Sequence, residues 1–169
     1  MIDIPASALL VAGFTLAHAT WSISDTTPAD LLVPLAIIEH DAKRTLQRFE
    51  AETQAQAISA GKAAEPQMSK SSEAWAFARE GSMRSPATST TTQDVILVDF
   101  WARGMSEPVT LIQQFERATT THGFHIIGQP LVSVAGKQLD SAQAQPLIET
   151  IMKGVISHPK VSTLWSTWQ

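Results

Sequence analysis

Two histidines three residues apart are the side chains best spaced for chemistry, in the run Thr121-His122-Gly123-Phe124-His125. Zinc and iron sites need three or four ligands that converge on the ion at about 2.0–2.2 Å. The two imidazoles could supply two ligands across a turn, with Glu116 or Asp99 on a neighbouring strand as the third. In a regular strand, however, His125 need not face the same way as His122. The ligand set is thin, so we expect surface or hydrogen-bonded histidines and no bound metal.

Asp99 interrupts the most apolar stretch of the chain, between Val98 and Phe100. A desolvated carboxyl group at this position would have a raised pKa, which is what a general acid needs. The alternative is an ion pair with Arg79 or Arg103 from nearby strand ends. Single carboxylates in strands usually find an arginine or water, so we expect the ion pair.

A catalytic interpretation would combine Asp99, Glu116, His122 and His125 in a metal-assisted or general-acid hydrolase. The polar trio Glu39-His40-Asp41 could also imitate part of a hydrolase triad. The sequence has no Gly-x-Ser-x-Gly nucleophile elbow to accompany it. We therefore expect the trio to be solvated charge at the tip of a hairpin.

Tryptophan is the more unusual feature of the composition, with five copies in a chain that has no tyrosine. Tryptophan is enriched in the energetic centres of protein interfaces. Trp75 and Phe77 alternate on one face of a predicted strand, and Trp165 and Trp168 lie on a predicted helix close to residue 169. Core packing is the alternative for Trp75. We expect the interface to comprise these four residues.

The composition limits the classes of function. The length of 169 residues fits one domain, 1–169. A net charge of −4 argues against nucleic acid as a partner, because its binders need a basic face. Only 17% of residues are charged, which leaves neutral or apolar surface for a protein partner. The absence of cysteine excludes disulfides and thiolate catalysis and is compatible with the cytoplasm, where we expect the protein.

The N-terminal apolar run, Ala6–Ala17, has two interpretations. A signal peptide would have a positive segment before it, whereas Met1–Pro5 carries Asp3. A membrane span needs about 20 apolar residues. We expect a buried helix and no membrane association.

Six segments have the composition or alternation of strands. In the third of them, alanines alternate with Trp75 and Phe77, which suits a helix packed on the alanine face. The stretch Gly81–Gln93 is expected to be a loop, and the last strand to bend at Gly128-Gln129-Pro130. The predicted strands are Leu31–His40, Thr45–Glu50, Glu73–Glu80, Asp94–Arg103, Val109–Ala118 and Phe124–Ala135.

Helices are expected at both ends and between the second and third strands. The first begins near Asp3 and turns extended within Phe14–Ser24. Thr53 and Gln56 have capping-box spacing before an alanine-rich helix, 54–64, that Pro66 stops, and Gly61 in it should pack closely against a neighbour. Asp140 or Ser141 opens the next helix, and Pro159 starts a short final one.

These elements predict a single α+β domain: an antiparallel sheet of about five to seven strands with the alanine-rich and C-terminal helices on one face. Among functions, we expect a non-enzymatic protein–protein interaction module, able to self-associate as a homodimer and without a cofactor. The hydrolase using His122, His125, Asp99 and Glu116 is one alternative. A small-ligand or lipid carrier with a cleft between sheet and helices is another.

Overall fold

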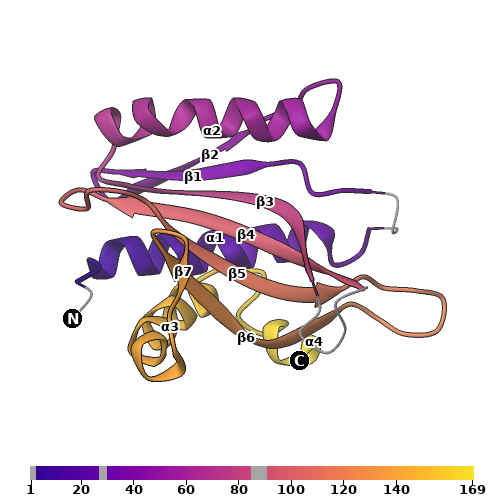
Figure 1. Ribbon diagram of the computed structural model, residues 1–169. Coiled ribbons are helices and arrows are strands. Elements are labelled where there is room, and N and C mark those ends of the chain that lie inside the picture. The colour runs from indigo at the N-terminus through magenta and orange to yellow at the C-terminus, as the bar shows by residue number, and fades with distance from the viewer. Residues whose placement is uncertain (1–2, 27–29, 85–90) are drawn as a thin grey trace.

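A computed structural model of the chain describes residues 3–26, 30–84 and 91–169. Seven strands form one antiparallel sheet in the order β2-β1-β3-β4-β5-β6-β7 (Figure 1). The strands are β1 (Leu35–His40), β2 (Lys43–Arg48), β3 (Ala74–Arg84), β4 (Thr92–Ala102), β5 (Val109–Glu116), β6 (His125–Val134) and β7 (Lys137–Gln138). The helices are α1 (Ala6–Ile23), α2 (Gln54–Ser71), α3 (Ser141–Ile156) and α4 (Trp165–Trp168). The predicted α+β fold class is confirmed.

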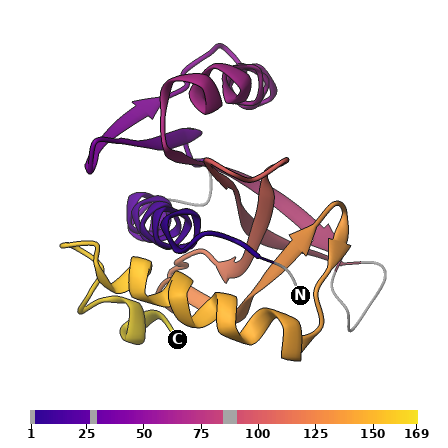
Figure 2. The same ribbon diagram turned by 90° about the vertical axis from the view of Figure 1, so that its left-hand side faces the viewer.

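The helices lie on both faces of the sheet (Figure 2). α1, α3 and α4 pack on one face, where Ala74, Ala76 and Ala78 of β3 join the main core. α2 lies on the opposite face and covers Trp75 and Phe77 in a second, smaller core. The expectation of one helical face is therefore wrong. Because both sets of β3 side chains are apolar, each face has to be covered.

A pair of glycines brings α1 and α3 into backbone contact. A Cβ atom on Gly13 would lie 1.9 Å from the carbonyl oxygen of Ile151, and one on Gly154 would lie 2.3 Å from that of Leu10. Any side chain at either position would separate the helices. By length and composition α1 could cross a membrane, but 61% of it is buried inside this fold.

α1 continues through the segment predicted to be extended. Its β-branched and aromatic residues have lower helix propensity than alanine, but Thr15, Thr20 and Ile23 are buried in the fold. The hydroxyls of Thr15 and Thr20 donate to the carbonyls of Val11 and Leu16, each at 2.7 Å. Tertiary burial therefore outweighs local propensity here.

α2 confirms its predicted start but not its predicted end. The Thr53 side chain accepts from the backbone of Gln56, whose side chain accepts in return from Thr53. The helix then passes through Pro66 to Ser71. Its last turns hold Met68 in the second core, which offsets the cost of the proline. The predicted close approach of Gly61 is confirmed, because a Cβ atom there would lie 2.1 Å from the Phe77 ring.

All six predicted strands are present with shifted ends, and the two-residue β7 was not predicted. Residues 85–90 of the predicted loop lie outside the described residues, whereas 81–84 and 92–93 belong to β3 and β4. The bend near Gly128 coincides with a register shift between β5 and β6. Asp140 caps α3 through a capping box with Gln143. The final helix begins at Trp165, later than Pro159.

Candidate functional site

Asp99 is buried on the α2 face of the sheet in a network of donors. Its Oδ2 atom accepts from Nη1 of Arg79 and from Nζ of Lys62, each at 2.6 Å. Its Oδ1 atom accepts from the hydroxyl of Thr110 at 2.7 Å. The predicted ion pair between Asp99 and Arg79 is confirmed.

The electrostatics of Asp99 oppose an acid-catalytic role. Burial alone would raise its pKa, but the charge of Arg79, hydrogen bonds from Lys62 and Thr110 and the charge of Lys62 together lower it. A general acid at neutral pH needs the opposite shift. Asp99 is therefore an ionised structural carboxylate that ties β4 to β3, β5 and α2.

The other three catalytic candidates lie at a different end of the sheet. Glu116 is opposite His125 in the β5–β6 pairing, and Glu116 and His122 line a hollow of about 500 Å³. All three side chains are exposed. Asp99 pairs with Thr110, six positions before Glu116 along β5, which is a separation of about 20 Å. The structure does not bring the four residues together.

The four predicted interface residues are in the interior. Trp75 and Phe77 have 0% exposure, Trp165 has 5% and Trp168 has 8%. Trp75 donates to the hydroxyl of Ser69 at 2.9 Å beneath α2. Trp165 and Trp168 meet edge to face and help to close the main core. None of the four offers its side chain to a partner in this fold, so the surface for a partner must lie elsewhere.

Two residues at the β1–β2 turn and Glu73, just before β3, could together bind a cation. One ligand atom each from His40, Asp41 and Glu73 lies within 4.8 Å of the others. Asp41 and Ala42 have φ values of 50° and 60°, as the type I′ turn of a two-residue hairpin requires. The side chains of His40 and Asp41 are exposed, so water competes for these positions. We assign no metal to this cluster.

An apolar groove lies between the underside of β2, the α1 helix and the chain after α3. Its volume is about 370 Å³. We call it the β2 groove, and its main lining residues are Phe14, His18 and Trp21 from α1, Arg44 and Leu46 from β2, and the segment 158–160. Trp21 and Leu46 are each 37% exposed. Aromatic and aliphatic side chains at an open site are the usual lining of a binding pocket.

Two imidazoles contribute to the wall of the β2 groove. Nδ1 of His18 lies 3.0 Å from Nε2 of His158, and Phe14 lies against His158 with ring centroids 4.8 Å apart. Burial, with the proximity of His18, lowers the pKa of His158 to about 4. Burial and the charge of Arg48 lower the pKa of His18. Both imidazoles are therefore neutral at pH 7, and the charged side chains of the lining are those of Arg44 and Lys160.

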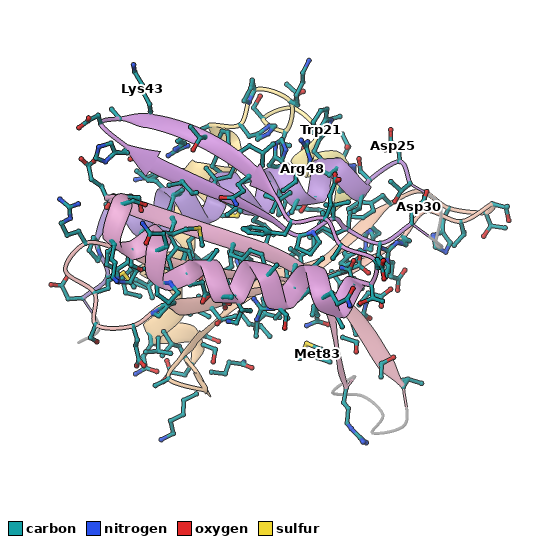
Figure 3. All side chains as sticks on the ribbon, turned by 90° about the horizontal axis from the view of Figure 1, so that it is seen from above. Trp21, Asp25, Asp30, Lys43, Arg48 and Met83 are labelled. Atoms are coloured by element: carbon teal, nitrogen blue, oxygen red, sulfur yellow. The ribbon has the colours of Figure 1, made fainter. Side chains whose placement is uncertain are left out.

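The edge strand β2 borders the groove. All six of its residues are exposed, and it pairs only with β1 among the described residues. The side chains of Arg44, Leu46 and Arg48 are opposite those of Glu39, Ile37 and Leu35 and share their face, the face of α1. Arg48 lines a small hollow together with Ser22 and Ile23 of α1, and Figure 3 shows Lys43 toward the other end of the strand.

Sequence reasoning did not find the β2 groove. Its two imidazoles are 140 positions apart, so no local pattern joins them. The one local signal is the spacing of Phe14, His18 and Trp21, at i, i+4 and i+7, which puts all three on one face of a helix. That signal is lost if the segment is taken as extended.

No protein-family model, curated protein or solved structure matches this chain. Function must therefore be inferred from the surface itself. The β2 groove is the feature of that surface that combines volume, exposed apolar side chains and an unpaired strand edge.

Proposed function

We propose that this protein is a protein-interaction module whose binding surface is the β2 groove. The observation that carries the proposal is that the groove opens beside the edge strand of the sheet, where large apolar side chains are exposed. A non-enzymatic role agrees with the lowered pKa of Asp99 and the separation of Asp99 from Glu116, His122 and His125.

Exposed apolar surface is concentrated at this edge. Of the five large apolar residues exposed among the described residues, Trp21 and Leu46 line the groove. Leu31 and Val33 line a neighbouring hollow of about 200 Å³ together with Arg48. Apolar side chains gathered beside charged ones are typical of a surface that a partner covers.

The proposal is tested by selecting binders from a random-peptide display library on the immobilised protein. We expect enrichment of peptides that bind the wild type and lose binding to Trp21→Ser and to Leu46→Ser. Gln47→Ser is the matched control for Leu46→Ser, because Gln47 is exposed on the opposite face of the same strand. Enrichment that these groove variants leave unchanged, or no enrichment at all, would contradict the proposal.

Self-association is measured separately by size exclusion with light scattering over a range of concentrations. A dimer that dissociates in Leu46→Ser would make a second copy of the chain the partner at the groove. A monomer that still selects groove-dependent peptides would make the partner a different protein. A groove that instead binds small apolar molecules, detected by mass spectrometry of the purified protein, would favour the carrier interpretation.

A further inference from the structure

We propose that the partner at the β2 groove is an extended acidic segment of another protein, which adds to the sheet as a strand beside β2. The side chain at its centre covers Leu46, and carboxylates two residues to either side meet Arg44 and Arg48. The inference rests on the proposed function and specifies the chemistry of the partner. Its three supports are the backbone of β2, the side chains of β2 and the charge of this edge.

The backbone of β2 presents a set of outward hydrogen-bonding groups. The two-residue turn makes His40 and Lys43 a hydrogen-bonded pair, and such pairs recur at every second residue of an antiparallel ladder. The N–H of Phe49 donates to the carbonyl of Pro34 at 2.8 Å. The pair at the other end of the strand therefore follows the same alternation of hydrogen-bonded residues. The N–H and C=O groups of Arg44, Leu46 and Arg48 therefore point away from β1, toward the open edge.

The same three residues put their side chains on the groove side of the sheet. In an antiparallel pair, residues directly opposite each other have their side chains on the same face, about 4.5–5.5 Å apart. A segment that hydrogen-bonds to this edge in a register centred on Leu46 thus has one side chain over Leu46 and the groove. Its residues two positions before and after lie opposite Arg48 and Arg44.

The two arginines favour carboxylates at the positions of the bound segment that lie opposite them, and Arg48 contributes more because Arg44 already pairs with Glu39. Arg44 pairs with Glu39 at 2.9 Å and lies over the Phe14 ring, 4.7 Å from its centre. No described carboxylate forms an ion pair with Arg48. The residues of β2 include Lys43, Arg44 and Arg48 and no acidic residue, whereas the whole chain has a net charge of −4. An acidic segment is therefore attracted to this edge in particular.

A second copy of β2 is a poor occupant. Antiparallel pairing of two β2 strands centred on Leu46 would put Arg44 of each copy opposite Arg48 of the other. Like charges directly opposite are destabilising. Basic residues on a strand edge are also a known means by which proteins prevent edge-to-edge association. The same residues that favour an acidic strand thus disfavour self-pairing.

The first experiment measures binding of three synthetic peptides by fluorescence anisotropy. The probe carries the core Glu-Thr-Leu-Thr-Glu, which puts both carboxylates and the leucine on one face of a strand. Thr-Glu-Leu-Glu-Thr has the same composition with the carboxylates on the other face, and Lys-Thr-Leu-Thr-Lys reverses the charge. We expect the probe to bind at least about tenfold more tightly than either control. Equal binding of the three, or no binding of the probe at millimolar concentration, would overturn the inference.

The second experiment uses two charge reversals on β2. Arg48→Glu should weaken probe binding about tenfold, whereas Lys43→Glu, with the same change in net charge but on the other face, should change it less than about twofold. Bound probe should slow hydrogen exchange at the amides of Arg44, Leu46 and Arg48. Unchanged exchange at these amides would overturn strand addition.

The two proposals fail in different ways. If the peptides selected from the library depend on Trp21 and Leu46 but are neutral, basic or proline-rich, the acidic-strand inference is wrong and the interaction module stands. If groove variants leave the binding of every selected peptide unchanged, the proposed function is wrong as well.

Discussion

His158 donates a hydrogen bond to His18 across the 3.0 Å that separates its Nε2 atom from Nδ1 of His18. The direction follows from the backbone N–H of Lys160, which donates to Nδ1 of His158 at 3.1 Å and so leaves Nε2 to carry the proton of a neutral ring. His18 then carries its own proton on Nε2, a buried atom without a hydrogen-bond partner among the described residues. This chain of donors depends on both imidazoles remaining neutral.

Stability should therefore fall when the solution is acidified. The pKa of His158 is about 4 in the folded protein and 6.5 in its ordinary state, so between these values the unfolded chain binds a proton that the folded chain does not. This contribution to the free energy of unfolding is fully present above pH 6.5 and is lost as the pH falls to 4. We expect the loss to be about 2–3 kcal/mol. Urea unfolding at a series of pH values measures it. His158→Gln should flatten the curve in this range, and an unchanged slope would contradict the assignment.

The contact between α1 and α3 predicts that Gly13→Ala is strongly destabilising. Alanine usually stabilises a helix relative to glycine by about 1 kcal/mol. Here its methyl group would overlap the Ile151 carbonyl, so we expect a loss of about 3 kcal/mol or more in the free energy of unfolding. Gly123→Ala is the control, since a Cβ atom there meets nothing within 4 Å. Equal effects of the two substitutions in thermal unfolding would argue against the close approach of the helices.

The network around Asp99 predicts unequal effects for its members. Asp99→Ala leaves the charge of Arg79 largely buried without its partner, so we expect a loss of about 3–5 kcal/mol in unfolding free energy. Lys62→Ala should cost no more than about 1 kcal/mol, because the Lys62 side chain is 46% exposed and can be solvated. Chemical denaturation of both variants checks the order. A larger loss for Lys62→Ala would show that the network is centred on the lysine instead.

The tryptophans provide a separate test of which surface is available to a partner. Trp75→Ala removes a fully buried ring and should cost about 3–5 kcal/mol. Trp21→Ala removes a ring that is 37% exposed and should cost clearly less, while it abolishes peptide binding at the β2 groove. A Trp75 variant that remains stable and loses binding would restore Trp75 as an interface residue.

The strands could be predicted because their signal is local. Alternation in β3 and the continuous apolar run in β4 each specify an extended segment that is buried on one face or on both. Turn residues and capping boxes, such as Asp140 with Gln143, then place the boundaries of neighbouring elements. These features explain why the α+β class followed from the residues alone.

The helical ends and the binding surface could not be predicted, because their causes are not local. Nothing near Pro66 indicates that Met68 is held in a core, and the helical spacing of Phe14, His18 and Trp21 is outweighed by neighbours of low helix propensity, although α1 continues to Ile23. His18 and His158 meet next to the close contact of α1 with α3, which involves residues far apart in the sequence. The exposure of β2 likewise follows from its place at the end of the strand order, which its own six residues do not specify.

The glycine contact between α1 and α3 has a consequence for biosynthesis. α1 leaves the ribosome well before 141–156, the segment that covers its glycine. At ordinary elongation rates, the ribosome needs on the order of ten seconds to synthesise the chain between α1 and the end of α3. The apolar face of α1 is not packed against α3 during that time. During this interval the nascent chain exposes the apolar face of α1, so the yield of folded protein should depend on what covers a newly made apolar helix in the cell.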